Sequence, residues 1–188
     1  MRDIILIMNI PEIVQKGTEN LHINAAEVPV SDITSPEIKQ VIANMKLALS
    51  GEPDGVAIAA PQIDISLRIF VVAGFVFGKG EADVAYINPI FVKKSKKTEL
   101  MDEGCLSVRY MYGKVKRHTN VTIEAYNEEG EKIERGAGGL LAHIFQHETD
   151  HLNGILFVDK AESSEIMSEK EQEDLNNKRN DAKQKISN

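Results

Sequence analysis

The chain has 188 residues, of which 42% are hydrophobic and 27% are charged, which is enough for one globular domain with a hydrophobic core. Its net charge of −7 gives no support for binding nucleic acid by bulk electrostatics, because such binding needs an excess of Lys and Arg. The single cysteine, Cys105, excludes an internal disulfide bond.

The first half of the chain predicts a strand, a helix and two further strands. The apolar run 4–8 is too short to cross a membrane and no cleavage pattern follows it, which favours a strand over a signal peptide. Residues 34–37, Thr-Ser-Pro-Glu, open a helix whose apolar period ends at Gly51. Segments 68–73 and 84–92 are rich in β-branched residues and predict strands.

The second half predicts a hairpin followed by a helix. Residues 115–126 alternate well enough for one long strand, and 127–130 form a turn from which 131–135 pairs back. Glycines between 136 and 139 should end that strand before a helix begins. Residues 162–188 carry seven acidic and five basic residues, so we expect a solvated polar tail or a loose helix there.

The predicted helix contains the motif His147-Glu148-x-x-His151. Two imidazoles at this spacing lie on one helix face and can bind one metal ion, and the carboxylate between them can act on a water molecule without being a ligand. Leu140 and Ile144 continue the same face, which predicts that both histidines point toward the core. A pair of core histidines without a metal is the alternative.

A catalytic metal usually has a third protein ligand. The upstream candidate is Cys105, within the segment Glu-Gly-Cys-Leu-Ser at 103–107, and we favour it because its thiolate is a metal ligand. Downstream candidates are Asp159, Glu162 and Glu165, and a ligand from among them would indicate a general metallopeptidase. A fourth protein ligand would instead indicate a purely structural metal site.

Three segments together resemble the signature motifs of the peptide deformylase family, in that family's order and spacing. They are Gly-Val-Ala-Ile-Ala-Ala-Pro-Gln at 55–62, Glu-Gly-Cys-Leu-Ser at 103–107 and Gln-His-Glu-x-Asp-His at 146–151. The resemblance covers roughly residues 4–160. It implies a single α+β domain, residues 1–161, with antiparallel β-sheets packed around a central metal-binding helix, followed by the tail 162–188.

The resemblance implies that Cys105, His147 and His151 bind one divalent metal ion and leave its fourth position to water. Fe(II) is the ion expected in the cell, whereas Zn, Ni or Co would serve in purified protein. The reaction implied is hydrolysis of the N-formyl group from the formyl-methionine of nascent peptides, with release of formate.

The remaining catalytic roles follow from the same resemblance. Glu148 would act as the general base and then as the general acid for the leaving amine. The side-chain amide of Gln62 and the backbone NH of Leu106 would bind the formyl oxygen and stabilise the oxyanion.

The resemblance also implies a cleft in which the peptide adds to a strand at 55–58. The residues expected to line this cleft are Gly55, Val56, Ala57, Ile58, Gly104, Tyr112, Leu140, His143 and Ile144. Core packing is the alternative for the apolar ones. The chain departs from the family pattern at Ala57, Arg109, Tyr112 and His143, so a deformylase-like protein with a weakened activity and an altered cleft, or a silent binding relative, is the alternative function.

Glu103 and Arg117 resemble a buried ion pair that supports the metal-binding loop, and a surface ion pair is the alternative. Asp150, between the two histidines, is expected to tie down the helix or the second nitrogen of a ligand.

The partners expected from the resemblance are formylated nascent peptides near a ribosome, and the protein is expected to be a monomer without membrane contact. A bacterial cytoplasm is the expected location, with an organelle as the alternative. The basic clusters 178–179 and 183–185 could contact ribosomal RNA, although a solvated charged tail is the preferred interpretation.

Overall fold

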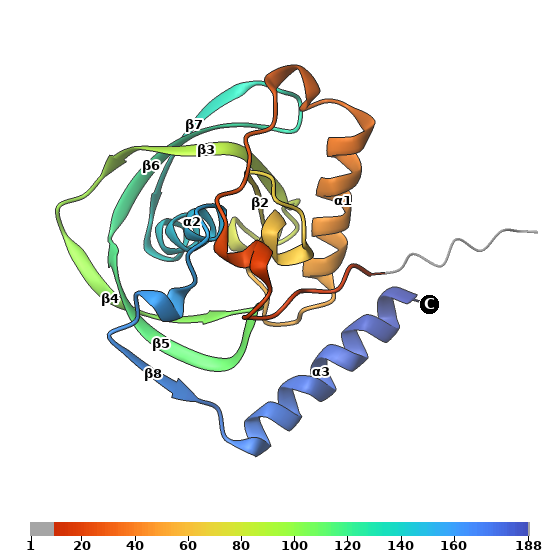
Figure 1. The fold of residues 1–188 in the computed structure, drawn as a ribbon, viewed down its shortest axis with the longest axis vertical. Helices are drawn as coiled ribbons and strands as arrows, with labels where there is room; N and C mark the ends of the chain where they lie inside the picture. The colour runs from red at the N-terminus through yellow and green to blue at the C-terminus, as the bar shows by residue number, and fades with distance from the viewer. Residues whose placement is uncertain (1–9, 188) are drawn as a thin grey trace, which may run out of the picture.

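The computed structural model describes residues 10–187, so the strand predicted at 4–8 lies outside the described residues. Two antiparallel sheets surround the central helix α2 (Figure 1). One sheet has five strands in the order β1-β2-β3-β6-β7, and the other has three in the order β4-β5-β8. The α+β class and the central position of the helix predicted from the sequence are therefore confirmed. Within the described part, no helix is long and apolar enough to span a bilayer.

The three helices are α1 (Pro36–Ser50), α2 (Gly139–Leu152) and α3 (Glu169–Ser187). The strands are β1 (Ala57–Ala59), β2 (Ile69–Val72), β3 (Val84–Lys94), β4 (Thr98–Cys105), β5 (Val108–His118), β6 (Asn120–Tyr126), β7 (Lys132–Gly138) and β8 (Ser163–Ile166). Short 3-10 helices connect them, including Ala60–Ile63 after β1 and Phe157–Asp159 after α2.

Helix α1 begins and ends where its sequence predicts. The Ser35 side chain caps it by accepting a hydrogen bond from the backbone N of Ile38 at 3.3 Å, Pro36 occupies its first position, and Gly51 follows its last residue. Its buried face, which includes Ile42, packs on β1 and β2. This packing supports the face of β1 that is turned toward α1.

The long strand predicted at 115–126 is wrong, because the chain turns at Thr119. Residues before this point belong to β5 in the three-stranded sheet, and residues after it belong to β6 in the five-stranded sheet. Every second side chain is buried on both sides of the turn, so the alternation continues across the corner and conceals it.

Glycine does not end the last hairpin strand where the sequence analysis expected. β7 continues through Gly136 to Gly138, opposite Thr122 and Asn120 of β6, since residues without side chains still form ladder hydrogen bonds. A Cβ at Gly138 would lie 2.8 Å from the side-chain nitrogen of Asn120, so a larger residue there would displace this exposed side chain. The predicted turn at 127–130 and its hairpin are confirmed.

Helix α2 is anchored by an aromatic cluster. The ring of Phe145 lies 4.9 Å from that of Tyr86 and 5.7 Å from that of Phe70, measured between centroids. The predicted inward face is only partly correct: Ile144 and His151 are buried, whereas Leu140 is 53% exposed. Leu140 lies in the first turn of α2, before the helix is enclosed by the sheets.

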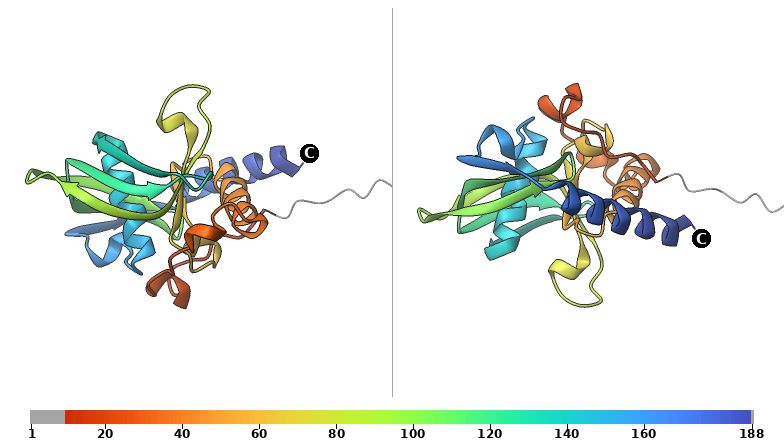
Figure 2. Two further views of the ribbon diagram at one scale, coloured as in Figure 1. Left: turned by 90° about the horizontal axis from the view of Figure 1, so that it is seen from above. Right: turned by 90° about the horizontal axis from the view of Figure 1, so that it is seen from below.

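The C-terminal segment is more ordered than predicted. Residues Ser163–Ile166 form β8, which pairs with β5 at the edge of the three-stranded sheet. Ile166, the last residue of β8, is 72% exposed. Helix α3 then runs along the outside of the molecule toward α1 (Figures 1 and 2).

Candidate active site

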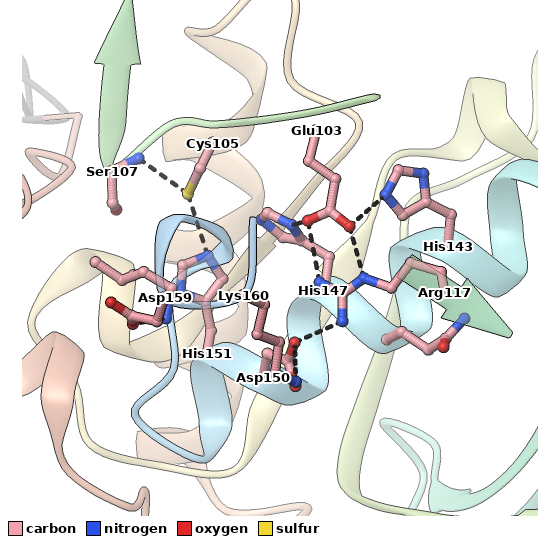
Figure 3. A network of polar contacts seen from close by, with 12 residues as sticks. Glu103, Cys105, Ser107, Arg117, His143, His147, Asp150, His151, Asp159 and Lys160 are labelled. Carbon is pink, nitrogen blue, oxygen red and sulfur yellow. Dashed lines mark hydrogen bonds and ion pairs between the residues drawn. The ribbon is translucent and has the colours of Figure 1, made fainter. Parts of the chain in front are cut away.

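Three potential metal ligands converge between α2 and the end of β4. One ligand atom each from Cys105, His147 and His151 lies within 4.8 Å of the others, and the Cys105 Sγ is 3.2 Å from His151 Nε2 (Figure 3). A thiolate with two imidazoles is a ligand set that suits divalent iron or zinc. The residues present therefore fit a single divalent ion with an open position.

The hairpin between β4 and β5 places Cys105 at this point. The pairing register shifts between Gly104 and Cys105, and the backbone NH of Ser107 donates to the Cys105 sulfur at 3.4 Å. A Cβ at Gly104 would lie 2.7 Å from the ring of Tyr112, so the close approach of this ring requires glycine.

The two histidines differ in their surroundings. Glu103 binds the Nδ1 of His147 at 2.8 Å, which leaves Nε2 available as the ligand atom. Burial lowers the pKa of His147, but hydrogen bonds to Cys105 and Glu103 outweigh it and raise this pKa well above its ordinary value. Cys105 and Glu103, which favour a positive charge on His147, would also stabilise a metal cation bound there. Burial lowers the pKa of His151 well below its ordinary value and keeps this imidazole in its neutral, metal-binding form.

Glu103 is the centre of a buried polar network (Figure 3). Its side chain is 1% exposed and accepts hydrogen bonds from Arg117 at 2.6 and 3.0 Å, while His143 Nε2 lies 2.8 Å from its Oε1. Burial would raise the pKa of Glu103, but the hydrogen bonds from His143, His147 and Arg117 lower it far below its ordinary range. The ion pair expected between Glu103 and Arg117 is thus an interior one.

Asp150 lies at the other end of this network. It accepts hydrogen bonds from Arg117 at 2.6 Å and from Lys160 at 2.6 and 2.7 Å. These contacts tie α2 to β5, as one of the two expectations for Asp150 had it. The other expectation is not met, since Glu103, and not Asp150, binds the second nitrogen of a histidine. Lys160 was not predicted, because nothing in its local sequence indicates this contact.

Glu148 is the carboxylate available for proton transfer. Its side chain is buried, and its Oε2 has no hydrogen-bond partner among the described residues. Burial raises the pKa of Glu148 to about 7. A carboxyl group with a pKa close to neutrality can both accept and release a proton during a reaction cycle.

Gln62 is held with its amide nitrogen toward the ligands. Its Oε1 accepts from the backbone N of Ala59 at 2.8 Å, while its Nε2 lies 3.2 Å from Ser107 Oγ and 3.6 Å from Cys105 Sγ. Gln15, which the sequence analysis did not identify, donates to the carbonyl of Leu106 at 3.0 Å. The Ala60–Ile63 turn and the loop after β4 are thereby fixed against each other.

A cavity of about 250 Å³ opens beside these residues. The predicted cleft residues that line it are Gly55, Val56, Ala57, Gly104, Tyr112, Leu140, His143 and Ile144. Ile58 is not among them: it is fully buried in the core against α1, because successive side chains of β1 point to opposite faces. Arg109, Tyr110, Met111 and Leu175 also line the cavity and were not predicted to do so.

The downstream ligand candidates lie elsewhere. Asp159 accepts a hydrogen bond from the backbone N of Leu156 at 2.9 Å, and Glu162 and Glu165 are exposed. Among the described residues, the ligand cluster that includes the two histidines takes its third member from Cys105. This arrangement counts against the metallopeptidase interpretation.

Comparison with known proteins agrees with the geometry. Residues 10–167 match the family model described as polypeptide deformylase. The peptide deformylase of Desulfitobacterium hafniense is 42% identical over 157 residues, which are 84% of this chain and 98% of the relative. The chloroplastic/mitochondrial peptide deformylase 1A of Arabidopsis thaliana is 37% identical over 167 residues, covering 81% of this chain and 62% of the relative.

A solved structure shows the same fold. The class I type b peptide deformylase from Acinetobacter baumannii, crystallised with K1U bound, superposes with a TM-score of 0.74 at 36% identity. The match covers 80% of this chain and 99% of that one.

Proposed function

This chain belongs to the polypeptide deformylase family, and we propose that Cys105, His147 and His151 hold the metal ion on which its activity depends. The chain is a deformylase that removes the N-formyl group from nascent peptides. The observation that carries the assignment of the site is the approach of three ligand atoms to within 4.8 Å of one another, next to a buried carboxylate.

We expect Fe(II) as the native ion and Zn, Ni or Co as substitutes. When bound, the ion supplies a Lewis acid that polarises a carbonyl oxygen and lowers the pKa of a water molecule. One thiolate and two neutral imidazoles leave a divalent ion with a net charge of about +1, so Cys105 moderates that acidity and makes the site sensitive to oxidation.

Glu148 carries the proton through the reaction. Its carboxylate takes a proton from water as the oxygen attacks the formyl carbon, and the protonated carboxyl then gives this proton to the amine as the carbon–nitrogen bond breaks. The products are formate and the free amino terminus of the peptide. Burial and a pKa of about 7 suit Glu148 to both steps.

Gln62 and Leu106 stabilise the charge that develops on the formyl oxygen. The Gln62 amide nitrogen and the Leu106 backbone NH are the two donors. Because Gln62 Oε1 is already bonded to the backbone N of Ala59, its amide cannot turn its oxygen toward the substrate without losing that bond.

The peptide is bound beside β1. This strand lies at the end of the five-stranded sheet, so an extended substrate can add to it through main-chain hydrogen bonds. The methionine side chain is accommodated by the apolar surface of Leu140, Ile144 and Tyr112. We favour a working deformylase over one weakened by its altered cleft, because the proposed ligands, base and oxyanion donors are all present.

The substrates imply a location near ribosomes that start synthesis with formyl-methionine. We propose a bacterial cytoplasm, with an organelle as the alternative that the Arabidopsis relative illustrates, and a monomeric enzyme.

The test is formate release from formyl-Met-Ala by protein purified without oxygen and loaded with Fe(II) or Ni(II). Replacing Glu148 by Ala should lower kcat by about 10²–10⁴-fold and leave the bound metal, measured by elemental analysis, unchanged. Glu129→Ala, which removes an exposed carboxylate from a turn, is the matched control and should retain wild-type turnover. Wild-type turnover by Glu148→Ala would refute the role of Glu148, and fully metallated wild-type protein without turnover would refute the function.

A further inference from the structure

Helix α3 lies beyond the family match, which ends at residue 167, while the helix begins at Glu169. It is strongly charged and contains few apolar side chains. Most of the stability of a helix in a protein comes from its contacts with the rest of the molecule, so the contacts of α3 are of interest. The views in Figures 1 and 2 place it along the side of the molecule from the end of β8 to the neighbourhood of α1.

One face of α3 makes specific polar contacts with the body. Asn176 Oδ1 accepts a hydrogen bond from the Tyr110 hydroxyl at 2.8 Å. Arg179 Nη2 donates to Glu52 Oε1 at 3.1 Å, and only 12% of the Arg179 side chain is exposed. The expectation of a solvated charged tail is therefore wrong for Arg179, whose charge is used inside the protein.

Glu52 connects this helix to the cleft. Its side chain, between α1 and β1, is 1% exposed. Besides Arg179, it accepts hydrogen bonds from Arg109 at 3.2 and 3.3 Å, and Arg109 lines the cavity beside the metal ligands. One buried carboxylate thus joins a cleft residue of β5 to the outer helix.

The contact between Arg179 and Glu52 holds α3 so that Leu175 faces the cavity. This leucine lies four residues before Arg179, so both point to the same side of α3, and Leu175 lines the cavity together with Tyr110 and Met111. A leucine in a mostly polar helix thereby supplies an apolar wall to the cavity.

We propose that Leu175 determines specificity for the residues that follow the formyl-methionine, and that Glu52, Arg109 and Arg179 are positioning residues that hold α3 against the cleft. This inference rests on the proposed function. The apolar wall should favour peptides with bulky apolar side chains at the second and third positions over peptides with alanine there.

The test compares kcat/KM for formyl-Met-Leu-Leu and formyl-Met-Ala-Ala. Leu175→Ala should lower kcat/KM for the leucine peptide about 5- to 10-fold and that for the alanine peptide less than twofold, because only the larger side chains lose an apolar contact. Leu100→Ala, which truncates a half-exposed leucine on β4 that is not part of the cavity wall, should change neither value.

A second variant tests the positioning residues without touching the wall. Arg179→Met should reproduce the selective loss on the leucine peptide and increase hydrogen exchange in α3, while Arg179→Lys should restore part of both. Lys178→Met removes the same charge from an exposed neighbour on the same helix and should have no effect. Equal losses on the two peptides, or no loss on either, would overturn the inference.

Failure of the proposed function would look different. If wild-type protein hydrolyses neither peptide, binding of the products Met-Leu-Leu and Met-Ala-Ala by calorimetry still reports the cleft. A preference for Met-Leu-Leu that Leu175→Ala reduces 5- to 10-fold would support the role of Leu175 at the cleft without the activity. Equal binding of the two products by wild-type and variant would overturn it.

Discussion

Two buried carboxylates, Glu103 and Glu52, each accept hydrogen bonds from arginine, yet they hold different parts of the molecule in place. Glu103 fixes the imidazole of His147, a proposed metal ligand, in the interior, whereas Glu52 fixes the helix α3 at the outside through Arg179. Both side chains are 1% exposed. A buried carboxylate paired with arginine therefore supports the proposed metal site in one place and the position of an outer helix in the other.

The partners of the two carboxylates differ in burial. Arg117, beside Glu103, is 5% exposed and is shared with Asp150, whereas Arg109, beside Glu52, is 16% exposed and is backed by a second arginine, Arg179. Losing Arg117 leaves Glu103 without a guanidinium and leaves Asp150 with Lys160 alone. Losing one arginine at Glu52 leaves the carboxylate still paired. The loss of folding stability on removing an arginine therefore depends on how deeply the ion pair is buried and on how many other cations contact the same carboxylate.

The largest expected effect is that of Arg117→Met. The substitution leaves Glu103 and Asp150 buried without their guanidinium, which should lower the free energy of unfolding by about 3–5 kcal/mol. Urea unfolding of metal-free protein measures this value. Arg109→Met is the matched comparison and should cost less, because Arg179 remains on Glu52. Equal losses would show that the two clusters do not differ as their burial indicates.

The next effect is on the metal. Glu103→Gln removes the anion that holds Nδ1 of His147, so metal affinity should fall about 10–100-fold in competition with a chelator. Glu52→Gln should leave the affinity unchanged, since Glu52 contacts none of the three ligand residues. If both variants lose the metal to the same extent, the effect comes from general loosening of the fold and not from the contact with His147.

The sequence predicts the ligands and base because their signal is local. The spacing of His147, Glu148 and His151 on one helix fixes their relation before any tertiary contact is known. The cap of α1 and the turn at 127–130 are equally local, and both are confirmed. Cys105 has no such local signal, because it lies in a distant hairpin. It was favoured as the third ligand because a thiolate can bind a metal, and the resemblance to a family added support.

The features that sequence reasoning missed depend on distant contacts. Strand β8 exists because it pairs with β5, and Arg179 is paired with Glu52 across 127 positions of sequence. The charged sequence of α3 predicts a solvated segment, because nothing in it indicates the contact with the buried carboxylate of Glu52. Ile58 was assigned to the cleft because its neighbours belong there, although alternation along β1 turns its side chain into the core.

The smallest expected effect is the pH dependence of the stability that Glu52 contributes. Burial would raise the pKa of Glu52, but hydrogen bonds from Arg179 and Arg109 outweigh it and lower this pKa below its ordinary value of 4.5. The folded state therefore binds the proton less readily than the unfolded state, so the contribution of Glu52 to stability is complete above about pH 4.5 and is lost as the pH falls below it.

Glu52→Gln should accordingly lower the free energy of unfolding by about 1–3 kcal/mol at pH 7, and the difference from wild-type protein should shrink as the pH falls below 4.5. Urea unfolding of both proteins between pH 7 and pH 3 measures it. Glu129→Gln, at an exposed turn, provides the control for a carboxylate without buried partners and should show no such difference. A difference that stays constant with pH would mean that Glu52 contributes through packing and hydrogen bonding that glutamine cannot reproduce, and not through its charge.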